Sequence, residues 1–190
     1  MNKNILKAIE IFNKGGIVIF PTDTAFGIGC RIDKEESIKK LFEIRERPES
    51  QPTPILVSNL EMAQKYLESI SADVEKLMKK FWPGALTIIL PCKTSKVPSL
   101  VRGGGKTLGV RIPNNKKIFS IIEALKVPIL GPSANIHGES TPYSLEDLDK
   151  RLIAQVDYVM SGETLVKEPS TVIDCSRLPW KILRKGAVSL

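Results

Sequence analysis

Hydroxyl and carboxylate side chains follow directly after the first strongly apolar segment of the chain. Residues 17–20 are apolar and largely β-branched, which predicts a buried strand, and Pro21 ends it because proline has no N–H. Two hydroxyls and a carboxylate come next: Thr22, Asp23 and Thr24. Gly27 and Gly29 then permit a positive φ or a close approach of the backbone. Open α/β proteins bind ligands where buried strands end, so this stretch predicts a ligand site, with an ordinary polar turn as the alternative.

A second polar segment follows another apolar run. Residues 127–130 predict a strand, and Ser133 and Asn135 come directly after it. A hydroxyl and an amide at a strand end can both donate hydrogen bonds to an anion, although an Asx or Ser turn has the same composition. His137, the single histidine, is close by. It could serve as a general base, but a surface loop histidine is the interpretation that the residues favour.

Four arginines stand where a charge needs a partner. Arg45 and Arg47 lie at the end of a predicted helix, and Pro48 disfavours helical geometry at Arg47. If that segment is extended, both guanidiniums face one side and can hold phosphate oxygens. A solvated helix C-terminus is the alternative, and the pair alone favours it. Arg111 ends an apolar strand and requires a structural or a ligand carboxylate, and Arg184 raises the same question.

The glycine-rich segment 103–107 does not form a Walker loop. That loop requires Gly-x-x-x-x-Gly-Lys-Ser/Thr, but Leu100 occupies the position of its first glycine, and a strand is expected to follow instead of a helix. A mobile loop carrying Arg102 and Lys106 beside a ligand is an open alternative. Asp23 could bind magnesium or cap a turn, and a single carboxylate is a weak metal signal.

Hydrophobic periodicity predicts the elements that must position these groups. Helices are expected over residues 4–13, 35–44, 59–66, 74–81, 116–125 and 144–152. Strands are expected over residues 17–20, 55–57, 86–90, 107–112, 127–130, 156–160, 170–174 and 181–184. Helices and strands alternate at first and strands cluster near the end. We therefore predict one α/β domain, residues 1–190, with a mixed sheet.

Composition bounds the class of protein. The 190 residues are 42% hydrophobic and 26% charged, as in ordinary globular proteins, and the net charge of +7 favours an anionic partner. No apolar run is long enough for a membrane span, and no signal sequence begins the chain, so we expect a cytoplasmic protein. The three cysteines are widely spaced and form no Cys-x-x-Cys motif, which argues against a zinc site or a disulfide framework.

Several motifs together resemble those of the YrdC family, the threonylcarbamoyl-AMP synthases. They stand in the family's order and at about its spacing, along almost the whole chain: residues 20–29, 45–48, 82–87, 109–113, 132–135, 169–174 and 183–187. The resemblance implies an open, twisted, mixed β-sheet with flanking helices and a positively charged concave cavity. It also implies that L-threonine, bicarbonate and ATP give threonylcarbamoyl-AMP and pyrophosphate, the first step of a tRNA modification completed by a separate threonylcarbamoyl transferase.

The resemblance also implies roles for particular residues. Those expected to bind L-threonine are Thr22, Arg111, Gly131 and Ser170. Those expected around the nucleotide are Arg45, Arg47, Thr107, Ser133, Asn135, Thr141 and Arg184. Of these, the chemistry is expected to depend on Arg45, Arg47, Ser133 and Asn135. Mg²⁺ is expected to arrive with ATP, without a dedicated protein metal site.

The chain departs from the family pattern at the phosphate contacts. Arg45 stands where lysine is usual, and Gln51 replaces another frequent lysine. The chain also ends soon after Arg184, so the extra C-terminal domain of longer members is not expected.

Two other functions stay open as alternatives. One is a structured-RNA-binding module without nucleotide turnover, although RNA-binding signatures are absent. The other is a carbamoyl-transfer role, as in longer hydrogenase maturation proteins.

Overall fold

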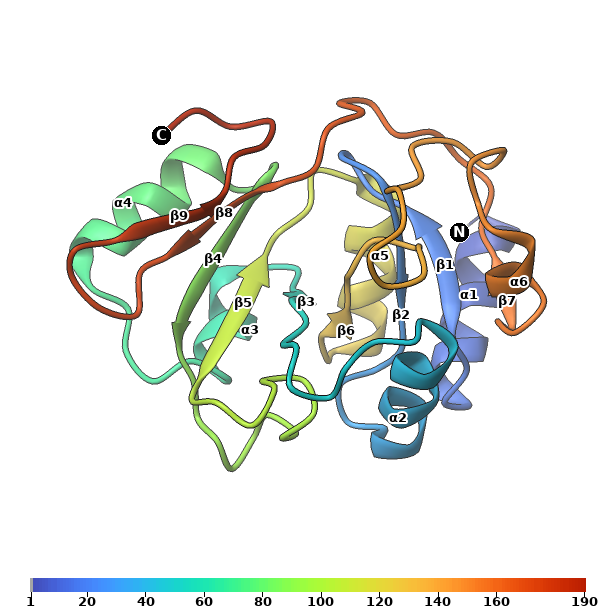
Figure 1. The fold of residues 1–190 in the computed structure, drawn as a ribbon, viewed down its shortest axis with the longest axis horizontal. Helices are drawn as coiled ribbons and strands as arrows, with labels where there is room; N and C mark the ends of the chain where they lie inside the picture. The colour runs from blue at the N-terminus through green and yellow to red at the C-terminus, as the bar shows by residue number, and fades with distance from the viewer. Residues whose placement is uncertain (1) are drawn as a thin grey trace.

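A computed structural model describes residues 2–190 of the chain (Figure 1). The helices within this range are Lys3–Asn13 (α1), Glu35–Ile44 (α2), Leu60–Gln64 (α3), Ala72–Phe81 (α4), Lys116–Leu125 (α5) and Lys150–Ile153 (α6). The strands are Val18–Pro21 (β1), Phe26–Gly29 (β2), Ile55–Leu56 (β3), Leu86–Pro91 (β4), Thr107–Arg111 (β5), Ile129–Leu130 (β6), Tyr158–Val159 (β7), Thr171–Asp174 (β8) and Lys181–Arg184 (β9).

The strands divide into two mixed sheets. One has the order β2-β1-β7 and the other the order β6-β3-β5-β4-β8-β9. Parallel pairs such as β4 with β8 occur beside antiparallel pairs such as β4 with β5, which confirms the predicted α/β class with mixed pairing. In Figure 1 the strands β4, β5, β8 and β9 lie at the left and β1, β2 and β7 at the right. Two isolated bridges, Gly27 to Ser133 and Arg31 to Ile129, connect the sheets.

Side-chain caps fix the start of five of the described helices. The capping residues are Asn2, Asn59, Ser71, Asn115 and Asp149. Each side-chain oxygen accepts a backbone N–H that the first helical turn leaves without a partner. The buried face of α5 consists of Ile118, Ile121, Ile122 and Leu125, so its cap sets how a core element begins.

The stretch after Pro21 is a hairpin and not only a turn. Phe26–Gly29 forms β2 and pairs antiparallel with β1, with Pro21 itself opposite Phe26. All four residues of β2 are buried, so apolar packing outweighs the weak strand propensity of two glycines. Gly29 allows the backbone of β2 to approach the backbone of β6 closely, because a Cβ at Gly29 would lie 1.9 Å from the Leu130 carbonyl oxygen. The turn is confined to the residues between β1 and β2.

The helix predicted over 144–152 is wrong for most of its length. Only Lys150–Ile153 is helical, and Asp149 is its N-cap. The Asp147 carboxylate accepts the backbone N–H groups of Tyr143 and Ser144 at 3.0 and 2.8 Å, which closes a local turn. Those bonds lower the pKa of Asp147 below its ordinary value. Such side-chain bonds compete with the helical ladder, which the apolar spacing alone could not indicate.

One core cluster extends across both sheets and includes buried residues of β1, β4, β5, α1 and α5. Phe12 and Phe20 are fully buried, with ring centroids 6.4 Å apart. The three cysteines, Cys30, Cys92 and Cys175, are buried and form no disulfide. Within residues 2–190, every helix is too short or too polar to cross a bilayer.

Candidate functional site

A cavity of about 140 Å³ lies where the ends of several strands meet, and most of the predicted site residues line it. Its walls come from the β1–β2 turn, the end of α2, the end of β5, the segment after β6, the start of β8 and β9. Nine of the eleven predicted residues line this cavity: Thr22, Arg45, Arg47, Arg111, Gly131, Ser133, Thr141, Ser170 and Arg184. The sheet therefore collects polar groups that are far apart in sequence, as strand ends do in open α/β folds.

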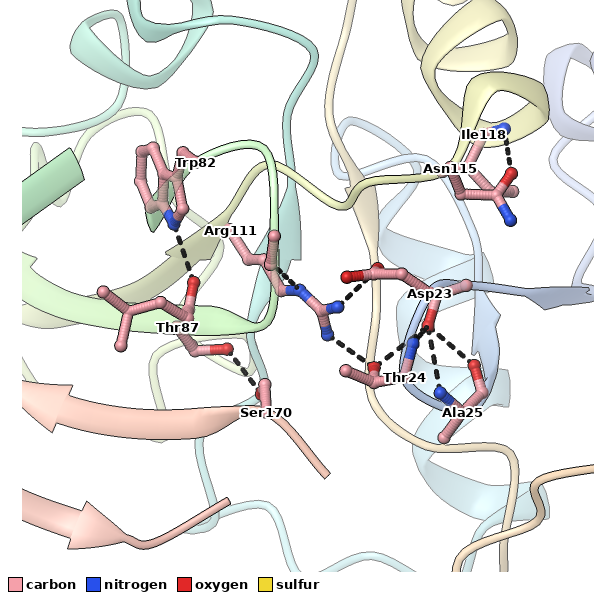
Figure 2. Close-up of polar contacts among 12 residues, drawn as sticks. Asp23, Thr24, Ala25, Trp82, Thr87, Arg111, Asn115, Ile118 and Ser170 are labelled. Atoms are coloured by element: carbon pink, nitrogen blue, oxygen red, sulfur yellow. Dashed lines mark hydrogen bonds and ion pairs between the residues drawn. The ribbon is translucent and has the colours of Figure 1, made fainter. Parts of the chain in front are cut away.

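Arg111 is held from three directions before any ligand arrives (Figure 2). Its Nη2 donates to Asp23 Oδ1 at 2.5 Å, its Nη1 to Thr24 Oγ1 at 2.8 Å and its Nε to the Gly84 carbonyl at 2.8 Å. Burial lowers the pKa of the Arg111 guanidinium, and the Asp23 carboxylate opposes that effect. The question raised by the sequence is answered, because Arg111 pairs with a structural carboxylate. Asp23 is a member of this ion pair.

The hydroxyl of Thr22 closes the turn between β1 and β2. Its Oγ1 donates to the Ala25 carbonyl at 2.7 Å and accepts from the backbone N–H of Thr24 and of Ala25, each at 3.2 Å. Thr24, which sequence reasoning did not assign to the site, lines the cavity and contacts Arg111 directly. The sequence signal for Thr24 was the second hydroxyl in the same turn. Only the structure shows that Thr22 closes the turn and that Thr24 contacts Arg111.

A hydroxyl pair and a guanidinium form the opposite wall. Ser170 Oγ lies 2.9 Å from Thr87 Oγ1, and Arg184 reaches both the carbonyl and the hydroxyl of Ser170, at 2.9 and 3.0 Å. Parallel pairing of β4 with β8 sets the first contact, and the return of β9 beside β8 sets the second. Burial, followed by the charge of Arg111, lowers the pKa of Arg184. Thr87 also lines the cavity, and sequence reasoning missed it because it reads as an ordinary strand residue.

Arg45 carries a buried charge with an incomplete set of partners. Only 3% of its surface is exposed, and its Nε donates to the Asn135 carbonyl at 3.0 Å. Its Nη1 is buried and has no hydrogen-bond partner. Burial lowers the pKa of Arg45 to about 9, and the charge of Arg47 acts in the same direction. An anion in the cavity would oppose both effects, because a nearby negative charge favours the protonated guanidinium.

Arg47 faces the same cavity as Arg45, but not through the extended segment that the sequence suggested. The segment is not extended, because Arg45 has a right-handed helical conformation and Glu46 a left-handed one, with φ 51°. Arg47 donates to the carbonyls of Gln51 and Pro52 at 3.1 and 2.5 Å. His137 is exposed, and its Nδ1 lies 3.5 Å from Arg47 Nη1. His137 does not line the cavity.

Two of the predicted residues lie outside the cavity lining. Asn135 stands behind it, where it accepts from Ser133 Oγ at 2.5 Å and from Arg45 Nη2 at 3.4 Å. Thr107 begins β5, pairs with Pro91 and is four positions along the strand from Arg111, about 13 Å in an extended strand. The structure therefore brings Asn135 to the site through its partners and leaves Thr107 away from it.

The fold and the cavity define an α/β protein with a cavity between two sheets that is lined by four arginines and several hydroxyls. Residues 10–186 match the model of the Sua5/YciO/YrdC family, described as telomere recombination. The chain belongs to this family.

Named relatives extend the comparison. The threonylcarbamoyl-AMP synthase of Pyrococcus abyssi is 35% identical over 184 residues, which cover 96% of this chain and 54% of that protein. The solved structure of P. abyssi Sua5 complexed with L-threonine has a TM-score of 0.91 and 34% identity, over 96% of this chain and 54% of that one. The uncharacterized protein YciO of Escherichia coli K12 is 33% identical over 96% of this chain and 88% of that protein. This chain therefore spans about half the length of the P. abyssi synthase.

Proposed function

We propose that the protein makes L-threonylcarbamoyl-AMP from L-threonine, bicarbonate and ATP and releases pyrophosphate. The observation that carries this proposal is the set of four guanidiniums, from Arg45, Arg47, Arg111 and Arg184, that line one cavity. A carboxylate, a bicarbonate and a polyphosphate require positive charge and hydroxyl donors. The synthases among its relatives and the threonine complex of P. abyssi Sua5 support the same assignment.

The amino acid fits the corner formed by Arg111, Thr24 and Ser170. Arg111 uses part of its guanidinium on Asp23, Thr24 and Gly84, and its remaining N–H groups are available for a carboxylate. We assign the threonine carboxylate to those groups, with Ser170 and the backbone near Gly131 beside it. Thr22 contributes by shaping the turn, since its own hydroxyl is bonded within that turn.

The nucleotide fits the side of the cavity with Arg45 and Arg47. Arg45 and Arg47 place guanidinium charge beside the phosphates, and Ser133 and Arg184 line the space between the two corners. The neutral threonine amine attacks the bicarbonate carbon, and loss of water gives the carbamate. A carbamate oxygen then attacks the α-phosphorus while pyrophosphate leaves. The residues act by orientation and by stabilising negative charge, which requires no nucleophilic triad.

We also propose that Mg²⁺ enters with ATP, where it would neutralise part of the phosphate charge. Among residues 2–190, no three His, Cys, Asp or Glu residues are grouped so as to hold a metal ion. Asp23 is engaged with Arg111. The tRNA and the transferase that consumes the product are proposed as downstream partners, and a cytoplasmic site of action follows from those substrates.

Pyrophosphate release tests the proposal. Purified protein is incubated with Mg-ATP and bicarbonate, with and without L-threonine, and we expect release that depends on threonine. A protein that binds ATP and threonine but releases no threonine-dependent pyrophosphate would refute the enzyme assignment. Steeply salt-dependent binding of structured RNA without turnover would instead support the RNA-binding alternative.

A further inference from the structure

The glycine-rich loop between β4 and β5 is closed by its own arginine. Arg102 donates from Nε to the Val97 carbonyl at 3.2 Å, and from Nη1 to the carbonyls of Gly104 and Gly105 at 3.3 and 2.5 Å. Neither Arg102 nor Lys106 lines the cavity. The guanidinium that the sequence offered as a ligand contact therefore serves to hold the shape of the loop.

The same loop packs closely on the segment that follows Arg47. The Thr53 N–H donates to the Val101 carbonyl at 2.9 Å, which joins the two segments. Gly103 has φ 56°, and a Cβ there would lie 2.6 Å from the Ser50 carbonyl oxygen and 3.0 Å from the Pro52 nitrogen. Those neighbours are backbone atoms, which cannot rotate away as a flexible side chain can. Any side chain at Gly103 must therefore displace residues 50–52 or the loop itself.

Residues 50–52 are also what orients Arg47. The Gln51 and Pro52 carbonyls accept from its Nε and Nη2. Arg47 forms part of the cavity wall and also of a larger neighbouring groove of about 730 Å³, which Gly103 lines as well. A continuous set of contacts thus runs from Gly103 through the backbone of residues 50–52 to the guanidinium that faces the cavity.

We infer that Gly103 is a positioning residue that sets the affinity for the nucleotide through Arg47. Because Gly103 has no side chain, the loop can seat against residues 50–52 and hold the two carbonyls that aim Arg47. The inference rests on the proposed nucleotide role of Arg47. It assigns a function to a motif whose sequence suggested a phosphate loop, while the contact with phosphate belongs to Arg47.

The chain supplies a matched control at the next residue. Gly104 also has a positive φ, 75°, but nothing lies within 4 Å of a Cβ placed there. Gly103→Ala and Gly104→Ala therefore share the strain of a left-handed alanine, and only the first displaces residues 50–52. We expect Gly103→Ala to raise the Kd for Mg-ATP about tenfold, the scale of a weakened charge-assisted hydrogen bond. Gly104→Ala should change it by less than about twofold.

Calorimetric titration of Mg-ATP measures this effect without turnover, and the KM for threonine checks that the amino-acid corner is intact. A double variant tests the route, because Gly103→Ala should add almost nothing in an Arg47→Ala background. Equal effects of the two glycine variants, or additive effects of Gly103→Ala and Arg47→Ala, would overturn the inference. If Gly103→Ala does not fold, Arg102→Gln, which releases the loop carbonyls, should weaken ATP binding in the same direction. An unchanged Kd there would also overturn it.

The outcomes separate this inference from the proposed reaction. Wild-type protein that binds ATP but makes no product refutes the reaction, whereas selective loss of ATP binding in Gly103→Ala still supports the inference. Normal turnover with unchanged ATP binding in Gly103→Ala refutes the inference alone. Wild-type protein that binds no ATP refutes both.

Discussion

The Asp23–Arg111 ion pair joins residues 88 positions apart in sequence and connects the turn after β1 to the end of β5. Side-chain exposure is 4% for Asp23 and 7% for Arg111. Removing one member of a buried pair leaves the other charge without a partner, which costs more than removing both. This contact therefore contributes to the fold as well as to the cavity.

Asp23→Ala should lower the free energy of unfolding by about 3–5 kcal/mol, because Arg111 would remain buried and charged. The double variant Asp23→Ala, Arg111→Met should recover part of that loss, since no isolated charge is left. Urea titrations of the wild type and both variants measure the difference. A double variant less stable than Asp23→Ala would show that the pair is not the source of the effect.

Arg111→Ala should mainly weaken the use of threonine, and Arg45→Ala mainly the use of ATP. The reason is that Arg111 bonds to Thr24 and lines the cavity together with Ser170, whereas Arg45 bonds to Asn135 on the side assigned to the nucleotide. Each variant should raise the KM for its own substrate at least about tenfold, as expected for a lost charge-assisted contact. Steady-state kinetics with each substrate varied in turn provides the test. Equal effects of both variants on both substrates would contradict the division of the cavity.

Sequence reasoning identified most of the residues that line the cavity but not how they are paired. The types and spacing of Arg45, Arg47 and Arg111 left an anion site open beside a solvated helix end and a structural ion pair, and the family resemblance supplied their roles. Sequence reasoning could not show that Asp23 contacts Arg111, because that contact depends on how the sheet that contains β1 packs against the sheet that contains β5. Thr87 gave no signal, since a threonine in a strand is ordinary.

At the level of the elements, strong periodicity and caps were predictable, while short elements depended on tertiary context. The helices α2, α4 and α5 lie close to their predicted ranges because their apolar spacing is strong, and in α4 and α5 a capping side chain marks the same start. The strand β2 was missed because glycine is a poor strand former and burial alone stabilises it. The long helix expected from residue 144 was lost to hydrogen bonds at Asp147.

Asn115→Ala should lower the free energy of unfolding by about 1 kcal/mol through the loss of the α5 cap. Asn115 Oδ1 accepts from the Lys117 and Ile118 N–H groups at 3.0 and 3.2 Å (Figure 2 draws the bond to Ile118). Ser120→Ala on the same helix is the control, because Ser120 is half-buried and its hydroxyl bonds to the Lys116 carbonyl one turn earlier, away from the helix start. Urea midpoints with unchanged slopes give both values. Similar losses in the two variants would argue against the cap as the cause.

For the whole molecule, the placement of the cavity between two sheets means that ligands contact both parts of the fold. Binding to the folded state alone raises stability by about 2.7 kcal/mol at a ligand concentration one hundred times Kd. For a chain of this size that corresponds to an increase in Tm of roughly 5–10 °C.

Threonine and Mg-ATP should each raise the Tm of the wild-type protein by about that amount at a concentration one hundred times Kd. Arg111→Ala should start from a lower Tm, because Asp23 loses its partner. It should lose the response to threonine and keep the response to ATP, since the nucleotide side of the cavity is unchanged. Differential scanning measurements at several ligand concentrations provide the test, with D-threonine as the stereochemical control. A Tm increase with threonine that persists in Arg111→Ala would place the amino acid elsewhere.

The sequence indicated the α/β class, but not that its strands form two sheets. Short strands such as β3, β6 and β7, of two residues each, carry little local information. Their pairing depends on contacts such as the close approach of Gly29 to Leu130, which no local pattern reveals.

The burial of all three cysteines has a practical consequence for following ligand binding in solution. Burial raises the pKa of Cys30 and of Cys175 to about 12, so these thiols react slowly with maleimides at neutral pH. Leu165 is 77% exposed, and its backbone N–H donates to the carbonyl of Asp23 at 3.1 Å. A cysteine introduced at that position would be the preferred site for a fluorescent dye. Its emission would report events at the Arg111 corner from outside the cavity, without a probe in the path of the substrates.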